Sequence, residues 1–503
     1  MRKTSRSGDP VYRIGQPSFA SSHTATLTER RKDRFTRIEP RGNRTHSARE
    51  RAQLLCDPGT FVESAPMRGH SAVGAGVVTG WGLIEERKVA VVSHDANVAS
   101  GAIGSVMAEA IVKTQRLAID HRMPIVHLND SGGARVPDGI LALHGCGQIF
   151  AHNVESQDII PQISVILGPC AGAAAYSPAL TDWTIMVKDQ GHMFLTGPTV
   201  VKAATGEDAT AEDIGGSGMH TAVSGVAHIE VDSEGEALQA VRRMMSFLPT
   251  SVGADHNVLV PKPANAAAAN TLGSVVPEKP SEIFDVLDVI KGVLDDSPML
   301  EVMAKHAGSA VTLFGRLDGA PVGVVANQPA VRGGILDSKT SGKIARFVEF
   351  CGRFGIPIIT FVDVPGFLPG TVEESRGVIT HGAKVLKAYS KAASPRLTVI
   401  LRKAYGGAYI AMGSTSLGAN AAWAWSNAEI AVMGPRGAVG LLNRRELAAS
   451  DDPEALRESL AATYREDVAR PYLAAENGII ESVIHPEETR TMLLSALRLW
   501  SAA

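Results

Sequence analysis

Residues 124–135 read PIVHLNDSGGAR, and residues 357–370 read PIITFVDVPGFLPG. Each stretch opens with an apolar run that is typical of a buried strand and closes in a turn rich in glycine or proline. Asp130 and Asp363 occupy matching places at the ends of the two runs, 233 positions apart. The chain therefore carries one strand-and-turn pattern twice.

The same pairing continues further along the chain. Residues 161–180 read PQISVILGPCAGAAAYSPAL, and residues 395–412 read PRLTVILRKAYGGAYIAM. Here Gly172 matches Gly407, 235 positions apart, and two Gly-Pro pairs that begin at Gly197 and Gly434 lie 237 apart. An offset that drifts by only four residues indicates a duplicated domain.

Composition describes a well-packed globular chain. It has 503 residues, 45 % of them hydrophobic, which is enough for two to four domains. No apolar run reaches the roughly 18–20 residues of a membrane span, so no membrane association is expected. The four cysteines lie far apart without a CxxC pair, which argues against a zinc ribbon or disulfide scaffold. A reducing compartment fits best: the cytoplasm or, as the alternative, the mitochondrial matrix.

The N-terminus is basic. Residues 1–51 hold 13 Lys and Arg against 5 Asp and Glu and show no apolar periodicity. We expect a flexible arm over residues 1–45. A transit peptide remains open, because the segment is rich in Arg and Ser. No nucleic-acid module follows it, so no nucleic-acid partner is expected.

Strands and helices alternate along the remainder. Hairpins are predicted at 76–94 and 310–327, and helices at 102–121 and near 139–153, which is the rhythm of an α/β fold with mostly parallel strands. Residues 249–280 are rich in Pro and Ala and indicate a linker. We place a first domain at 46–260, the linker at 261–280 and a second domain at 281–503.

Each glycine turn stands where a strand passes into a helix. There the first backbone N–H groups lack internal partners, and the helix dipole favours negative charge. Two such N–H groups from adjacent turns would form an oxyanion hole, and each half supplies two turns. Tight turning and close packing alone are the alternative explanation. The pairs are Gly132–Gly133, Gly172–Ala173, Gly366–Phe367 and Gly407–Ala408.

No side chain stands out as a general base. Asp130 and Asp363 are expected to hold loops rather than to carry protons, and His220 and His228 to be packed or hydrogen-bonded. Cys170 lacks an identifiable His partner, so it is a poor candidate nucleophile. Oxyanion holes without a nucleophile suit an enolate, and two of them fit carboxyl transfer between a urea nitrogen and an acyl α-carbon.

Two cations follow the strand of the second half. Arg402 and Lys403 could contact an anionic ligand, or could simply be solvated. The sequence alone does not decide between these two readings.

Long motifs carry a family resemblance. NDSGGARV, FLTGPTVVKAATGED, ITFVDVPGFLPG, RKAYGGAY and NAEIAVMGPRGAV resemble the carboxyltransferase β subunits of biotin-dependent acyl-CoA carboxylases, closest to the propionyl-CoA/acetyl-CoA type, over roughly residues 48–500. The resemblance implies two tandem crotonase-like (ClpP/crotonase) domains, each a ββα superhelix. It also implies a hexamer, a trimer of dimers, in which the N-half of one subunit faces the C-half of another.

The resemblance also assigns roles to residues. It places the thioester enolate on Gly133, Gly172 and Ala173, and the biotin urea oxygen on Gly366, Gly407 and Ala408, with Phe367 beside the biotin. Gly132, Ala134, Tyr176 and Ile410 would contact the acyl-CoA. Biotin would arrive on a separate biotin carboxylase/biotin carboxyl carrier subunit, and no metal is implied. A decarboxylase or transcarboxylase subunit is the alternative, and a non-catalytic scaffold is a third possibility.

The chain departs from the family pattern at several positions. It reads AGAA where the family usually has AGGA, which puts Ala173 at an oxyanion position, and Ile410 stands where the propionyl type usually has Asp. SHDAN (93–97) and GILDS (334–338) replace SQDFT and GCLDI. A changed substrate and neutral drift explain these departures equally well.

Overall fold

A computed structural model describes residues 44–65, 75–279 and 282–500, and most of the predicted basic arm lies outside these ranges. The chain divides into two compact units. Unit 1 contains residues up to 217 together with 230–242, and unit 2 contains 218–229 and everything from 243 onward. Within the described ranges, no helix is both long and apolar enough to cross a membrane.

Unit 1 is built on an eight-stranded sheet. Its order is β1-β2-β3-β4-β5-β6-β8, with β7 paired to β5. The predicted hairpin is confirmed as the antiparallel pair β2–β3, and β3 through β6 then run parallel. The strands are β1 (Val62–Glu63), β2 (Val77–Ile84), β3 (Arg87–His94), β4 (Ile125–Ser131), β5 (Gln162–Ala171), β6 (Trp183–Val187), β7 (His192–Phe194) and β8 (Ile229–Val231).

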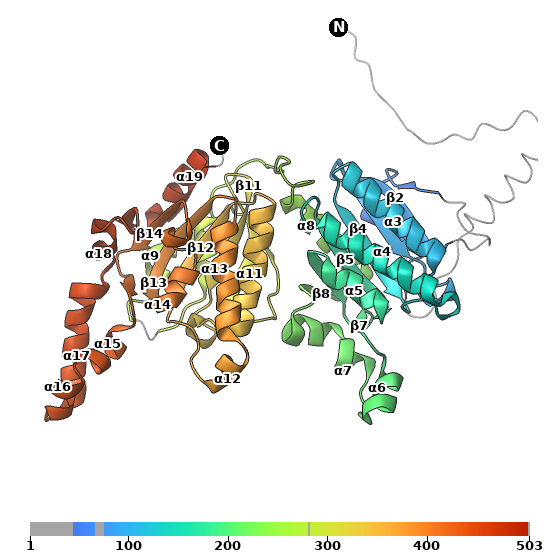
Figure 1. The fold of residues 1–503 in the computed structure, drawn as a ribbon. Coiled ribbons are helices and arrows are strands. Elements are labelled where there is room, and N and C mark those ends of the chain that lie inside the picture. Colours follow the sequence, from blue (N-terminus) through green and yellow to red (C-terminus); the bar gives the residue numbers. More distant parts are fainter. Residues whose placement is uncertain (1–43, 66–74, 280–281, 501–503) are drawn as a thin grey trace, which may run out of the picture. The chain divides into compact units, whose positions relative to one another are not determined.

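Helices cover this sheet. α3 and α4 lie side by side against it (Figure 1), and buried Met107, Ile111 and Ile149 join them to the strands in one core. The α-helices of the region are α2 (Ala48–Leu55), α3 (Ser105–Asp120), α4 (Ile140–Ser156), α5 (Ala173–Leu180), α6 (Pro198–Thr205), α7 (Ala211–Gly215) and α8 (Glu234–Phe247). Ser47 and Glu50 form a capping box at the start of α2.

Unit 2 repeats the plan with its own sheet, in the order β16-β14-β13-β12-β11-β10-β9, with β15 paired to β13. The predicted hairpin is again present as the antiparallel pair β10–β11. The strands are β9 (Leu300–Glu301), β10 (Ala310–Leu317), β11 (Ala320–Asn327), β12 (Ile358–Val364), β13 (Arg396–Tyr405), β14 (Ala421–Trp425), β15 (Glu429–Ala431) and β16 (Ser482–Ile484).

In unit 2, α11 and α13 pack side by side (Figure 1). The apolar runs of β12 and β13 are buried on both faces, as expected for central parallel strands. The α-helices are α9 (Ala266–Val275), α10 (Val286–Val293), α11 (Ser338–Arg353), α12 (Thr371–Ser375), α13 (Val378–Lys391), α14 (Gly406–Ala411), α15 (Pro435–Leu442), α16 (Arg444–Ala449), α17 (Pro453–Tyr464), α18 (Pro471–Glu476) and α19 (Thr489–Trp500).

Part of the predicted linker, residues 261–280, is helical and belongs to unit 2. Asn265 caps helix α9, whose buried Leu272 joins the core of unit 2 beside α10. The division by contacts also gives residues 243–260 to unit 2. Arg316 explains this assignment, because its guanidinium donates to the carbonyls of Ser246 and Asn257. Proline and alanine content therefore did not mark an unstructured segment.

The structure shows which residues of the two repeats correspond to one another more directly than the sequence offsets do. β5 and β13 both have ten residues, and each pairs through its last three with a short strand, from Pro169↔His192 in unit 1 and from Lys403↔Glu429 in unit 2. In this comparison of the two strands, Gly172 corresponds to Gly406 and not to Gly407. Both glycines directly follow the strand with φ near +60°. The counterpart of Ala173 is thus Gly407.

Candidate functional site: two turns of backbone amides

The first turn follows β4, and backbone hydrogen bonds hold it at Gly132, Gly133 and Arg135. Gly132 donates its N–H to the Ser100 carbonyl at 2.9 Å, and Gly133 donates to the Ser131 hydroxyl at 3.2 Å. Ile103 bonds to both neighbours of Ala134, donating to the Gly133 carbonyl and accepting from Arg135. In such a parallel bridge the N–H of Ala134 itself points away from Ile103. Ala134 therefore presents a donor.

Gly133 has to be glycine. Its φ is +99°, and a Cβ built on it would come within 2.7 Å of the Ala171 carbonyl oxygen. The close approach also shows that the turn after β4 lies against the end of β5. Two stretches separated in sequence thus bring their amides to one place in unit 1.

The second part of this site follows β5. Gly172, with φ +57°, donates to the Phe194 carbonyl at 2.9 Å, so its N–H is used inside the fold. Ala173 is the first residue of α5, and no side chain caps that helix. Its N–H has no partner within the described ranges. The available donors at this turn are therefore Ala134 and Ala173, and Gly133 and Gly172 shape the backbone that directs them.

Unit 2 repeats the geometry. Leu336 donates to the Gly366 carbonyl and accepts from Leu368, so the N–H of the bridging residue, Phe367, points away from Leu336. Gly366 has φ +144°. Gly407 lies in the first turn of α14, which also lacks a side-chain cap, and it is exposed. Phe367 and Gly407 are thus the counterparts of Ala134 and Ala173.

A hydrogen-bonded cluster lies at the start of α14. The Tyr405 hydroxyl donates to Glu429, and Arg465 donates to the other carboxylate oxygen of Glu429 at 2.6 Å. Burial, reinforced by the nearby Glu429 carboxylate, raises the pKa of the Tyr405 phenol, so the hydroxyl stays protonated. The Tyr405 ring also lies close to Gly434, where a Cβ would be 3.1 Å from it. The second turn therefore rests on a rigid base.

Asp130 and Asp363 hold loops, as expected. Both sit where the strand pairing shifts register, and both are buried in ion pairs. Arg44 and Arg51 donate to Asp130, and Arg402 donates to Asp363 at 2.9 Å.

Arg402 was expected either to contact an anionic ligand or to be solvated, and the structure shows neither. It is 1 % exposed, and besides Asp363 it donates to the carbonyls of Lys279 and Glu282. It is therefore neither solvated nor free to contact a ligand. Lys403 is 9 % exposed, and its Nζ lies 3.7 Å from Asp363.

The remaining side-chain candidates are structural. Cys170 is fully buried, and burial raises the pKa of its thiol, so a thiolate nucleophile is disfavoured. His220 contacts the Ser224 hydroxyl at 2.8 Å, and the carbonyl of buried His228 accepts from Met303. Both histidines are packed or hydrogen-bonded, as expected.

Two predicted contact residues are open to solvent. Tyr176 is 50 % exposed and meets Phe150 edge to face. Ile410 is 42 % exposed and lies in α14, three residues after Gly407. Each follows the amide donors of its own unit along the same short helix.

A cleft of about 630 Å³ lies beside the first turn, and sequence reasoning missed it. It is lined by Ala99, Ala102 and Arg135, and by the start of α3, where Ser105 donates its N–H to Asp138 at 3.3 Å. Arg135 ends the motif SGGAR, so the motif did carry a signal. The other lining residues come from several segments, including the starts of α3 and α4, and share no motif.

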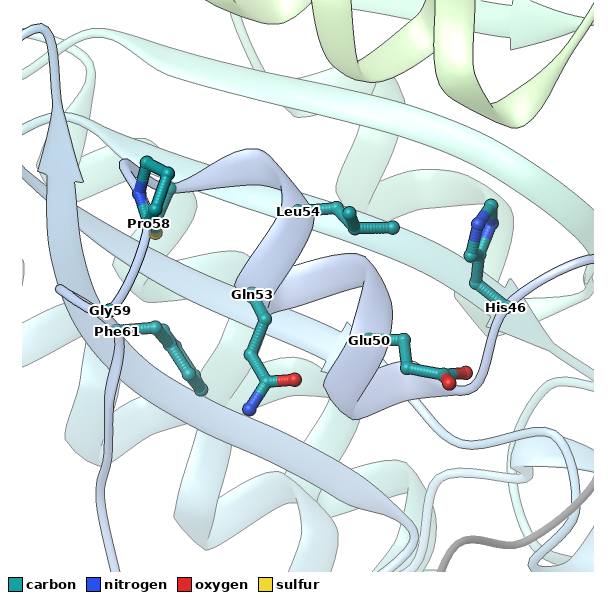
Figure 2. A pocket seen from close by; sticks show the side chains of 8 residues that line it. His46, Glu50, Gln53, Leu54, Pro58, Gly59 and Phe61 are labelled. Carbon is teal, nitrogen blue, oxygen red and sulfur yellow. The ribbon is translucent and has the colours of Figure 1, made fainter.

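A second hollow, of about 610 Å³, lies on the outer face of α2. Figure 2 shows Glu50, Gln53 and Leu54 from the helix, with Phe61 from the segment after it. None of the glycine turns contributes to this hollow. The opposite face of α2 carries Arg51, which is buried against Asp130.

Comparison with known proteins gives a family match over nearly the whole chain. The model of the carboxyl transferase domain matches residues 38–502. The propionyl-CoA carboxylase carboxyltransferase subunit of Haloferax mediterranei is 48 % identical, covering 93 % of this chain and 92 % of that protein. The methylmalonyl-CoA decarboxylase subunit alpha of Veillonella parvula is 45 % identical, covering 90 % of this chain and 89 % of that protein.

A solved structure agrees in fold. The transcarboxylase 12S crystal structure, described as a hexamer assembly with methylmalonyl-coenzyme A and methylmalonic acid bound, superimposes with a TM-score of 0.91. It shares 41 % sequence identity and covers 97 % of both chains. The expected two-domain crotonase-like fold is thereby confirmed.

Proposed function

The chain belongs to the carboxyl transferase domain family and is a carboxyltransferase of the propionyl-CoA carboxylase and transcarboxylase group. We propose that its two amide turns each stabilise one of the two partners in the transfer reaction. The turn of unit 1 holds the enolate oxygen of a CoA thioester. The turn of unit 2 holds the ureido oxygen of carboxybiotin. The duplicated pairs of outward-directed N–H donors carry this proposal.

On the acyl side, the amides of Ala134 and Ala173 are the donors. Gly133 and Gly172 give the backbone the left-handed turns that aim them, and Gly132 ties the loop to Ser100. Amides fixed in this way stabilise charge on an oxygen without having to reorganise during reaction. Removing one such donor typically costs about 100- to 1,000-fold in kcat.

On the biotin side, the fit rests on the same chemistry. The amide of Phe367 points away from Leu336, and that of Gly407 lies in the first turn of a helix without a side-chain cap. These two amides would hold a ureido oxygen, with Gly366 and Ala408 shaping their loops. Carboxybiotin, when bound, supplies the carboxyl group and then a ureido nitrogen basic enough to take the α-proton. The ring of Phe367 lies close to Gly382, where an added Cβ would come within 3.2 Å of it.

No side chain of the first turn is assigned the role of base. Asp130 is locked by two guanidinium groups, and Cys170 is a buried thiol. Their roles are positional, and this agrees with a mechanism in which the protein orients and stabilises charge. The cleft beside Ala134 is proposed to take part of the CoA, with Arg135 at its rim.

Further roles of the assembly are also proposed. Biotin arrives on a separate carrier subunit with a biotin carboxylase, and copies of this chain assemble as a hexamer, as the transcarboxylase 12S protein does. Apolar side chains are exposed on helices that follow the turns after β4 and β12 in the sequence: Ile140 and Leu141 in α4, Val372 in α12 and Ile379 in α13. A cytoplasmic location stays a prediction, supported by four buried cysteines that are all free thiols.

The decisive experiment is reconstitution. The full chain is combined with a biotinylated carrier and biotin carboxylase, ATP and bicarbonate, and CoA thioesters from C2 to C8 are tested for carboxylation. Incorporation of labelled bicarbonate into at least one thioester is expected. Failure with every thioester, by a protein that still binds CoA esters in calorimetry, would reject the proposal.

A decarboxylase or transcarboxylase role is the second candidate, because the Veillonella parvula relative is named as a methylmalonyl-CoA decarboxylase subunit. The same amide turns serve both directions of transfer. Release of CO₂ from methylmalonyl-CoA with carrier biotin and without ATP, faster than ATP-driven carboxylation, would favour it.

A further inference from the structure

One structurally equivalent position differs sharply between the two units. Gly168 of β5 corresponds to Arg402 of β13, because both are the seventh residue of a ten-residue strand. Arg402 reaches back to Asp363, whereas a Cβ on Gly168 would lie 2.2 Å from a carboxylate oxygen of Asp130. Unit 1 therefore has the same aspartate but no room for an arginine from its own strand.

In unit 1 the guanidinium groups come from a segment far away in sequence. Arg44 donates to both carboxylate oxygens of Asp130, at 2.6 and 2.8 Å, and Arg51 of α2 donates at 3.2 Å. Arg51 is 1 % exposed and also donates to buried Glu234 at 2.6 Å. Buried charges held in this way are strongly fixed, since breaking one pair leaves an uncompensated charge.

Asp130 connects this cluster to the amide turn. The next residue, Ser131, donates its hydroxyl to the Gly101 carbonyl at 2.7 Å and accepts the N–H of Gly133. Gly101 fits tightly here, because a Cβ on it would lie 2.1 Å from the Asp130 carbonyl oxygen. A displaced Asp130 would thus shift Ser131 and Gly133, and with them the direction of the Ala134 amide.

We propose that Arg51, assisted by Arg44, is a positioning residue for the first amide turn and replaces, from the N-terminal segment, what Arg402 does within its own strand in unit 2. The inference rests on the proposed function for its kinetic readout. It makes α2 part of the acyl-CoA side of the reaction, although α2 contributes no donor to the substrate.

The test compares four variants of the full chain. Arg51→Met removes the guanidinium, and Arg51→Lys restores a charge without the planar fork. Gly168→Ala places a Cβ against the Asp130 carboxylate and leaves both arginines unchanged. Arg49→Met is the matched control, because Arg49 lies in the same helix but pairs with Glu63.

Transfer of carboxylate from methylmalonyl-CoA to free biotin is measured as a function of each substrate. Calorimetry with methylmalonyl-CoA counts the competent sites, and kcat is expressed per site. We expect Arg51→Met and Gly168→Ala each to lower kcat per site by about 10- to 100-fold while the KM for biotin changes less than twofold. Arg51→Lys should recover part of the loss, and Arg49→Met should match the wild type within twofold.

Two results would overturn the inference. One is a normal kcat per site in both Arg51→Met and Gly168→Ala. The other is a fall in activity that only follows a fall in the number of binding sites, since this would show a folding role alone. If the wild type transfers nothing, the proposed function fails instead. If Arg51→Met does not fold, the kcat of Gly168→Ala tests the inference alone, because this variant keeps Arg44, Arg51 and Asp130.

Discussion

At the scale of single residues, the available amide at the second turn of unit 1 is that of Ala173 and not that of Gly172. The N–H of Gly172 donates to the Phe194 carbonyl, so the available donor is Ala173. Because this chain reads AGAA where the family usually has AGGA, that donor residue carries a methyl group. A backbone donor survives this change because the N–H does not depend on the side chain. Only the space around it becomes smaller.

Gly133→Ala tests the geometry of the first turn. At φ +99°, with the Ala171 oxygen 2.7 Å from the new Cβ, the loop has to move, and strain of this kind costs about 1–3 kcal/mol. We expect kcat for carboxyl transfer to fall by roughly 100-fold, as for loss of an oxyanion donor. Gly147→Ala is the control, because a Cβ there meets nothing within 4 Å. Equal kcat values for the two variants would exclude a role for the turn.

Ile410→Asp tests substrate selection. Ile410 lies on α14 close to the second turn, and a carboxylate there would alter the polarity of the site. We expect the ratio of kcat/KM between acyl-CoAs of different length to change by about 10-fold or more, since about 1.4 kcal/mol is sufficient. Ile479→Asp is the control, as Ile479 is also 42 % exposed. An unchanged ratio would remove Ile410 from the site.

At the scale of elements, strands, hairpins and turns were predictable, and the segment between the halves was not. Apolar runs and glycine positions mark the strands locally, so β4, β5, β12 and β13 follow from the sequence. α9 depends instead on a partner: its Leu272 joins a core only because the helix packs beside α10. The partners of Asp130 also escaped prediction, because Arg44 and Arg51 lie about 80 residues away in sequence.

Leu272→Ala tests whether α9 is a packed element. Leu272 is 2 % exposed, and truncating such a side chain costs about 2–5 kcal/mol. We expect a lower urea midpoint for the unfolding of unit 2, as measured by hydrogen exchange in the peptides of β10 and β11. Ser274→Ala, at an exposed position of the same helix, should leave the midpoint unchanged. Equal midpoints for both variants would show that α9 adds no stability.

At the scale of the whole molecule, unit 1 is predicted to be sensitive to acid. Burial lowers the pKa of His94 to about 4 and of His127 to about 3. Their unfolded pKa is near 6.5, so the unfolded state binds more protons as the pH falls from about 6.5, and stability is lost down to about pH 3–4. At about 1.4 kcal/mol per pKa unit, each histidine contributes a loss of roughly 3–5 kcal/mol.

Glu234 adds a loss at lower pH. Burial alone would raise its pKa, but hydrogen bonds from Arg51, Gln190 and His46 outweigh burial and hold the pKa at about 2. Its stabilising effect is present above pH 4.5 and disappears as the pH falls towards 2.

Hydrogen exchange at pH 7, 5.5 and 4.5 measures this sensitivity. We expect the peptides of β3 and β4 to lose protection as the pH falls, and His127→Asn to lessen that loss. His121→Gln, at an exposed position, should behave like the wild type. Protection of β3 and β4 that is independent of pH would contradict the prediction.

The order in which the chain visits its two units has a practical consequence. Residues 218–229 belong to unit 2 but precede 230–242 of unit 1, and α8 continues through the division at Arg242 and Arg243. No single cut can therefore yield two intact halves as separate polypeptides. A split-gene version of this enzyme would need the intervening dozen residues grafted onto the other fragment.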